Sequence, residues 1–256
     1  TYGELGPDED VRVERAQSIF KRILAVAGRR AGVVPRLLVI KNEPKGFSLP
    51  VALPDGSIII SRRALDICYR DNELGDDRLA FVLGHEIAHQ LNDDFWHLRF
   101  FLASQRLSSG HDVKVLHRKI FEVEGTPERI MAKELLADEN GAIYAALAGF
   151  RVGLLVDSED RNFFTEWENA RGLDRLEPSI VTDSYPNANE RARAVEACLR
   201  RVIERTDIFN LGVLLYEAGH YEEAASAFEE FLLYFPSTEV QHNLGCCYHQ
   251  MALRDY

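Results

Sequence analysis

The sequence predicts an α+β fold: a mainly helical body that carries one small antiparallel sheet, followed by a short helical segment of a different pattern. Three observations support this class. Apolar residues recur at helical spacing along most of the 256 residues, strand-type stretches are confined to the first quarter of the chain, and the pattern changes near Asp207. Strands and helices do not alternate, which excludes a doubly wound sheet or a barrel.

The chain is expected to begin with an amphipathic helix and a cluster of three strands. Apolar spacing predicts a helix over Val11–Ala27, which Gly28 ends. Strand-type stretches follow at Arg36–Ile40, Phe47–Leu53 and Ser57–Ser61. The turn residues Pro54-Asp55-Gly56 join the last two stretches. We therefore expect the three strands to form an antiparallel sheet.

From Ala64 onward the body is expected to be nearly all helical. Apolar spacing predicts helices at Arg78–Leu91, Phe95–Leu107, Val113–Val123 and Glu128–Leu147. Gly149 follows the last of them as a helix-ending residue. Because no glycine-rich loop precedes a helix, the sequence does not support a phosphate-binding site.

The last fifty residues follow a repeat. Asn210-Leu211-Gly212 returns as Asn243-Leu244-Gly245 after 33 residues, and the small and large residues between them match a tetratricopeptide (TPR) helix pair. We expect a body over residues 1–205 and a TPR-like segment of one and a half repeats over residues 206–256. A plain helical hairpin remains the alternative. Because one and a half repeats are too few to be stable alone, we expect the segment to pack on the body or to continue in a longer chain.

Charge and composition exclude several classes of function. The 41 acidic and 30 basic residues give a net charge of -11, which disfavours nucleic acid and anionic lipid as partners. No apolar run approaches the length of about 20 residues that a membrane span requires. The cysteines show no metal-type spacing, so we expect buried thiols at Cys68, Cys198, Cys246 and Cys247.

His85-Glu86-Ile87-Ala88-His89 carries the clearest chemical signal of the sequence. A spacing of four places both imidazoles on one face of a helix, where they can hold one zinc ion, with Glu86 beside them as the general base. The alternative is a pair of hydrogen-bonded histidines without a metal. Because the surrounding helix is almost wholly apolar, burying two histidines and a carboxylate there is costly without a metal. We expect one zinc ion per chain.

A catalytic zinc ion needs a third protein ligand. The motif HExxHxxGxxH, in which the third ligand is a histidine six residues after the second one, is excluded. Its last histidine is replaced here by Phe95, and its glycine by Asn92. A second helix offers Glu134 as the ligand, with Asp138 one turn further on to accept a hydrogen bond from a ligand imidazole. A solvated acidic helix face is the alternative for these two carboxylates.

LAFVLGHEIAHQ and the later KELLADENGAIYAALAGF resemble zinc metallopeptidases of the gluzincin type, the group of HtpX-type heat-shock proteases, Oma1-type proteases and CAAX prenyl endopeptidases. FSLP and LPDGSIIISRRALDI extend the resemblance, which covers residues 47–195. It implies a gluzincin peptidase domain in which zinc is held by His85, His89 and Glu134, Glu86 is the catalytic base, and Asp138 orients a ligand. Soluble bacterial relatives often carry TPR tails.

One loop departs from the resemblance. The family has a His-Pro step followed by an arginine six residues after the histidine, whereas this chain has Tyr185 in place of the histidine and retains Arg191. The Tyr185 hydroxyl either donates a hydrogen bond to a developing oxyanion or only anchors the loop. For Arg191 we expect a structural role near the metal.

The function expected from these features is a zinc metalloendopeptidase that acts on extended or misfolded polypeptides in bacterial protein quality control, with a protein partner bound by the TPR segment. The strand that holds Ser57, Ile58, Ile59 and Ile60 is expected to form the sheet edge with which substrate pairs. The periplasm or cell envelope is favoured by the resemblance, and the cytoplasm stays open. A chaperone or adaptor with a latent or structural zinc site and a non-peptidase zinc hydrolase are the rivals.

Overall fold

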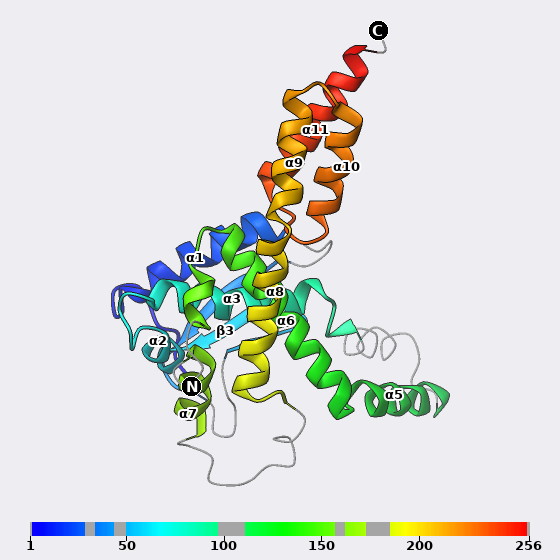
Figure 1. The fold of residues 1–256 in the computed structure, drawn as a ribbon. Helices are drawn as coiled ribbons and strands as arrows, with labels where there is room; N and C mark the ends of the chain where they lie inside the picture. The colour runs from blue at the N-terminus through cyan, green and yellow to red at the C-terminus, as the bar shows by residue number, and fades with distance from the viewer. Residues whose placement is uncertain are drawn as a thin grey trace. The chain divides into compact units, whose positions relative to one another are not determined.

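The computed structural model describes residues 2–28, 34–43, 50–96, 111–156, 162–172 and 185–254. Its elements, in chain order (Figure 1), are α1 (Arg12–Ala27), β1 (Arg36–Ile40), β2 (Val51–Ala52), β3 (Ser57–Ser61), α2 (Arg62–Cys68), α3 (Gly75–Leu91), α5 (His111–Glu124), α6 (Pro127–Leu147), the 3₁₀ turn η1 (Val152–Leu155), α7 (Phe163–Gly172), α8 (Ala188–Glu204), α9 (Thr206–Glu217), α10 (Tyr221–Leu232) and α11 (Thr238–Arg254). The predicted α+β class is confirmed. Most of the predicted helix at 95–107, and the start of the predicted strand at 47–53, lie outside the described residues.

The chain divides into two compact units, Thr1–Val195 and Glu196–Tyr256. The division falls within α8, whereas the sequence places the end of the body after residue 205. No helix among the described residues is both long enough and apolar enough to cross a bilayer. All four cysteines are free thiols, of which Cys246 alone is only half-buried.

The sheet differs from the predicted antiparallel one, because its strand order is β1-β3-β2. β3 pairs with β1 in parallel, with Arg36 opposite Ser57, and with β2 in antiparallel fashion, with Val51 opposite Ile59. After the tight turn that follows β2, the chain forms β3 between β1 and β2. β3 is therefore the central strand, and the expectation that it forms the sheet edge is wrong.

The two outer strands have different surroundings. The backbone N–H of Leu5 donates to the carbonyl of Val39 at 2.8 Å, and Glu4 forms an antiparallel bridge with Ile40, so the N-terminal stretch lines the outer side of β1. In the part of the chain that the structure describes, no strand pairs with the outer side of β2. β2 also contacts α3.

Helix α3 is the centre of the first unit. It is apolar on nearly every face, which is typical of a helix that is enclosed by other elements. It packs against α1, α6 and the sheet, and its buried side chains include Leu79, Leu83 and Ile87. Acidic residues in its first turn favour helix formation at the N-terminus, where Asp77 also binds Arg151 at 2.8 Å.

Two glycines set the distance between α3 and α6. A Cβ atom added to Gly84 would lie 2.7 Å from the carbonyl oxygen of Gly141, and one added to Gly141 would lie 2.6 Å from the backbone nitrogen of His85. Side chains at these positions would hold the helices apart. The two backbones therefore cross in direct contact, next to the first histidine of the motif.

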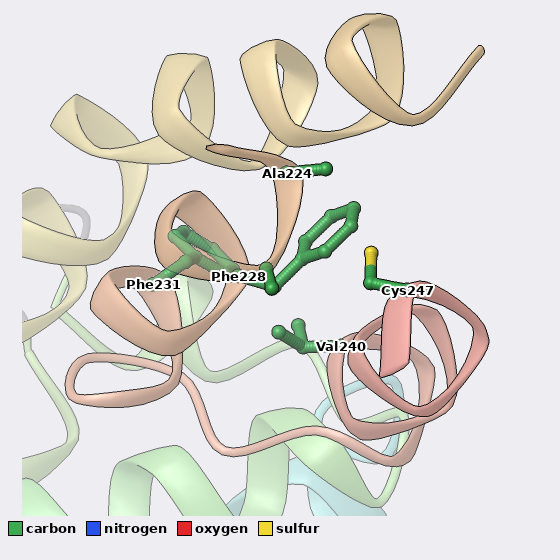
Figure 2. Packing of buried hydrophobic residues seen from close by; sticks show 6 residues of the cluster. Ala224, Phe228, Phe231, Val240 and Cys247 are labelled. Atoms are coloured by element: carbon green, nitrogen blue, oxygen red, sulfur yellow. The ribbon is translucent and has the colours of Figure 1, made fainter. Parts of the chain in front are cut away.

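The second unit has a core of its own, built by α9, α10 and α11. Phe228 is almost fully buried, and Figure 2 shows it among Ala224, Phe231, Val240 and Cys247. Gly212 on α9 leaves room for the Phe228 ring, since a Cβ at that position would lie 2.8 Å from a ring carbon. Three consecutive helices packed in this way fit the predicted repeat, whose assignment as TPR remains a prediction.

Candidate metal centre

Helix α3 brings His85 and His89 together on one buried face. Their side chains are one helical turn apart, and the two Nε2 atoms lie 3.0 Å from each other. Both residues are more than nine-tenths buried. The pair is therefore withdrawn from water at a place where an unpartnered polar group would be costly.

Glu134 on α6 faces both imidazoles. Its Oε2 lies 3.5 Å from His85 Nε2, and its Oε1 lies 3.5 Å from His89 Nε2. The three residues form a group whose ligating atoms all lie within 4.8 Å of one another. The structure thus brings Glu134 next to His85 and His89, which precede it by 49 and 45 positions along the chain.

The donor set fits zinc in both chemistry and size. Two imidazole nitrogens and one carboxylate are the ligands of many catalytic zinc sites. In a tetrahedral site with bonds of about 2.0–2.2 Å, neighbouring donor atoms lie about 3.3–3.6 Å apart. The separations here are 3.0, 3.5 and 3.5 Å, so little movement would place all three donors around one ion.

Asp138 and Arg191 hold His85 from behind. His85 Nδ1 donates to Asp138 Oδ1 at 2.8 Å, and Arg191 donates to the same carboxylate from Nε at 2.7 Å and from Nη2 at 2.6 Å. Burial raises the pKa of Asp138, but Arg191 and His85 outweigh it and lower the pKa to about 2. Asp138 therefore stays ionised and fixes the proton of His85 on Nδ1.

Opposing influences also act on His85 and Arg191. In the absence of a metal, burial lowers the pKa of His85, whereas Asp138 and Glu134 raise it, to a net value of about 10. The pKa of Arg191 is lowered by burial and raised by Asp138, Glu134 and Glu86, with a net rise. Arg191 thus carries a permanent positive charge, which is paired directly with Asp138.

Glu86 and Tyr185 are the two residues for which the sequence predicts catalytic roles. Glu86 follows His85 on α3 and is buried. Tyr185 is half-exposed and lies three residues before α8, the helix that carries Arg191. The roles of both residues remain predictions.

The residues Ser57, Ile58, Ile59 and Ile60 do not lie at a sheet edge. Ile58 and Ile60 are fully buried in the core, and Arg36 Nε donates to Ser57 Oγ at 2.7 Å. Since β3 has a strand on each side, we withdraw the expectation that substrate pairs with it.

Asp94 belongs to the site, although the sequence does not single it out. His89 Nδ1 donates to Asp94 Oδ2 at 2.7 Å, so the second histidine has its own carboxylate partner. The available signal is an acidic residue five positions after His89, just beyond the end of α3. That signal is weak, because acidic residues are common after helices.

Comparison with protein-family models matches residues 11–198 to a single description, peptidase family M48. No curated protein and no solved structure matches the chain. The matched range holds every residue of the site described above.

Proposed function

The chain belongs to peptidase family M48, and from this premise we propose that it is a zinc-dependent endopeptidase that cleaves extended or misfolded polypeptides. The family accounts for metallopeptidase activity on polypeptide substrates. The observation that supports zinc is the buried group His85, His89 and Glu134, with Glu86 next to His85 on the same helix. A purely structural metal site would not need that additional carboxylate.

The proposed reaction is hydrolysis of a peptide bond by a water molecule. Zinc, when bound, supplies Lewis acidity that polarises the substrate carbonyl and lowers the pKa of the attacking water. Glu86 accepts the proton of that water and then donates it to the leaving nitrogen. Asp138 and Arg191 keep His85 oriented throughout. The Tyr185 hydroxyl is the proposed hydrogen-bond donor to the carbonyl oxygen as negative charge develops there.

The outer side of β2 is the proposed place for an extended substrate. A strand with an unpaired side can add a peptide through backbone hydrogen bonds. β2 contacts α3, which carries both histidines, and no described strand pairs with its outer side. This arrangement favours unfolded segments over folded domains as substrates.

For the second unit we propose protein binding, and for the whole chain a role in bacterial protein quality control. The support is the 33-residue recurrence of Asn-Leu-Gly on α9 and α11, together with the small-to-large contact of Gly212 with Phe228. The rival function is an adaptor whose metal site is structural. A buried general base beside the metal group favours the peptidase.

Metal content and cleavage of denatured casein by the full-length chain test this function. We expect about one zinc ion per chain, and cleavage that a chelator abolishes. Glu86→Gln should retain zinc but lose activity by a factor of about 10²–10⁴, since a positioned general base contributes that much. Glu139→Gln is the matched control, because it removes one carboxylate outside the metal group and should change neither property.

Two results would contradict this function. Full activity of Glu86→Gln, after contaminating protease is excluded, would show that Glu86 is not the base. A wild-type chain that holds zinc but cleaves no denatured protein would favour the adaptor.

A further inference from the structure

Helix α3 ends in a turn that folds the chain back over its own last ligand. The helix ends at Leu91, and Asp93 adopts a left-handed conformation with φ of 59°. The Asp93 N–H donates to the carbonyl of Gln90, and the Asp94 N–H donates to the carbonyl of His89 at 3.2 Å. This pair of hydrogen bonds defines a Schellman motif, which commonly ends helices.

The same turn aims the Asp94 side chain at the His89 ring. Asp94 Oδ2 lies 2.7 Å from His89 Nδ1, and both side chains are about nine-tenths buried. An ionised carboxylate only accepts hydrogen bonds, so the imidazole proton must lie on Nδ1. The lone pair of His89 then lies on Nε2, the atom that faces Glu134.

Contacts with α6 keep this turn in place. Lys133 Nζ donates to the backbone carbonyl of Asp94 at 3.4 Å and to Glu124 Oε2 at 2.7 Å. Asn140 donates from Nδ2 to Asn92 Oδ1 at 3.1 Å. Lys133 directly precedes the ligand Glu134, so the Asp94 turn and the third ligand are tied to the same stretch of helix.

We propose that Asp94 is a positioning residue of the metal centre, which holds His89 in the tautomer and orientation that zinc requires, as Asp138 does for His85. The inference rests on the proposed zinc site. It assigns Asp94 two linked tasks: its N–H caps the helix at the His89 carbonyl, and its carboxylate orients the ring of the same residue. The helix end and the ligand orientation thus depend on one side chain and one backbone turn.

Zinc affinity, measured by chelator competition on the full-length chain, tests the proposal. Asp94→Ala should weaken zinc binding by about 10- to 100-fold, as loss of a hydrogen-bond partner of a ligand histidine does. Asp94→Asn keeps an acceptor oxygen, so we expect its affinity to lie between those of Asp94→Ala and the wild type. Glu128→Gln removes one exposed carboxylate from the first turn of α6 and should bind zinc as the wild type does.

A second measurement separates positioning from mere helix capping. With Co²⁺ as the bound ion, the visible absorption bands report the ligand geometry, and we expect Asp94→Ala to shift them while Glu128→Gln does not. If Asp94→Ala fails to fold, Asp94→Asn carries the same test. Affinity and spectrum equal to the wild type in the folded variants would overturn the proposal.

The outcome for Asp94 can be distinguished from the outcome for the enzyme. A wild-type chain that binds zinc tightly but cleaves nothing, with Asp94→Ala weakened, would refute the peptidase and retain the positioning role. A wild-type chain that cleaves casein, with the zinc affinity of Asp94→Ala unchanged, would support the peptidase and refute the positioning role of Asp94. A wild-type chain that takes up no zinc would overturn both.

Discussion

In both His85 and His89, each of the two ring nitrogens faces a carboxylate. Asp138 and Asp94 accept from the two Nδ1 atoms, and Glu134 lies opposite both Nε2 atoms. The outer carboxylates set the tautomers, and the inner one completes the donor set. Because three carboxylates surround two imidazoles, the site favours positive charge at its centre, supplied by a metal ion or by a proton.

The metal-free protein should show this preference in its stability. The pKa of His85 in the folded state is raised to about 10, above the 6.5 of a free histidine, so its stabilising effect is complete below about pH 6.5 and is lost as the pH rises toward 10. The melting temperature of the chelator-treated wild type should therefore fall over this range more steeply than that of His85→Gln. Each kcal/mol lost corresponds to about 2–4 °C for a domain of this size. Equal slopes would contradict the assigned shift.

At the scale of the elements, the site depends on how closely α3 and α6 cross. Gly141→Ala should place a Cβ 2.6 Å from the His85 backbone nitrogen, where no side-chain rotation can relieve the clash. We expect a loss of about 1–3 kcal/mol in the free energy of unfolding and weaker zinc binding, because the ligands on the two helices move apart. Urea denaturation and zinc titration measure the two effects.

Gly153→Ala is the matched control for this helix crossing. A Cβ at Gly153 meets no atom within 4 Å, so the variant should unfold and bind zinc as the wild type does. If Gly141→Ala behaved like this control, the crossing would not determine the metal site.

The sequence predicts the parts of the site that local helical geometry controls. A spacing of four is enough to place His85 beside His89, and Glu134 one turn before Asp138. The glycine contact depends on the distance between two helices, which no local pattern encodes, and Asp94 depends on the path of the backbone after α3 ends. The strand order differs from the expectation for a similar reason, since turn residues predict a hairpin but not which side of an earlier strand it joins.

At the scale of the whole molecule, zinc should stabilise one unit and leave the other unchanged. All residues of the metal centre lie in Thr1–Val195, whereas the core around Phe228 lies in Glu196–Tyr256. Binding only to the folded state adds RT ln(1 + [Zn]/Kd), about 4 kcal/mol when zinc exceeds Kd a thousandfold. Hydrogen exchange followed by mass spectrometry should show added protection in α3 and α6 but none in α9 to α11. Equal protection in both units would show that they are thermodynamically coupled.

The donor set described above also determines the metal selectivity of the site. Calcium requires six to eight oxygen ligands at about 2.3–2.6 Å and magnesium an octahedron of oxygens, so two imidazoles and one carboxylate reject both. Cobalt, nickel and copper accept the same nitrogen and oxygen donors, and copper binds such sites more tightly than zinc does. The centre therefore discriminates against the abundant alkaline-earth ions but not among the later transition metals. We therefore expect the supply of free ions where the chain folds to decide which of those metals fills the proposed site.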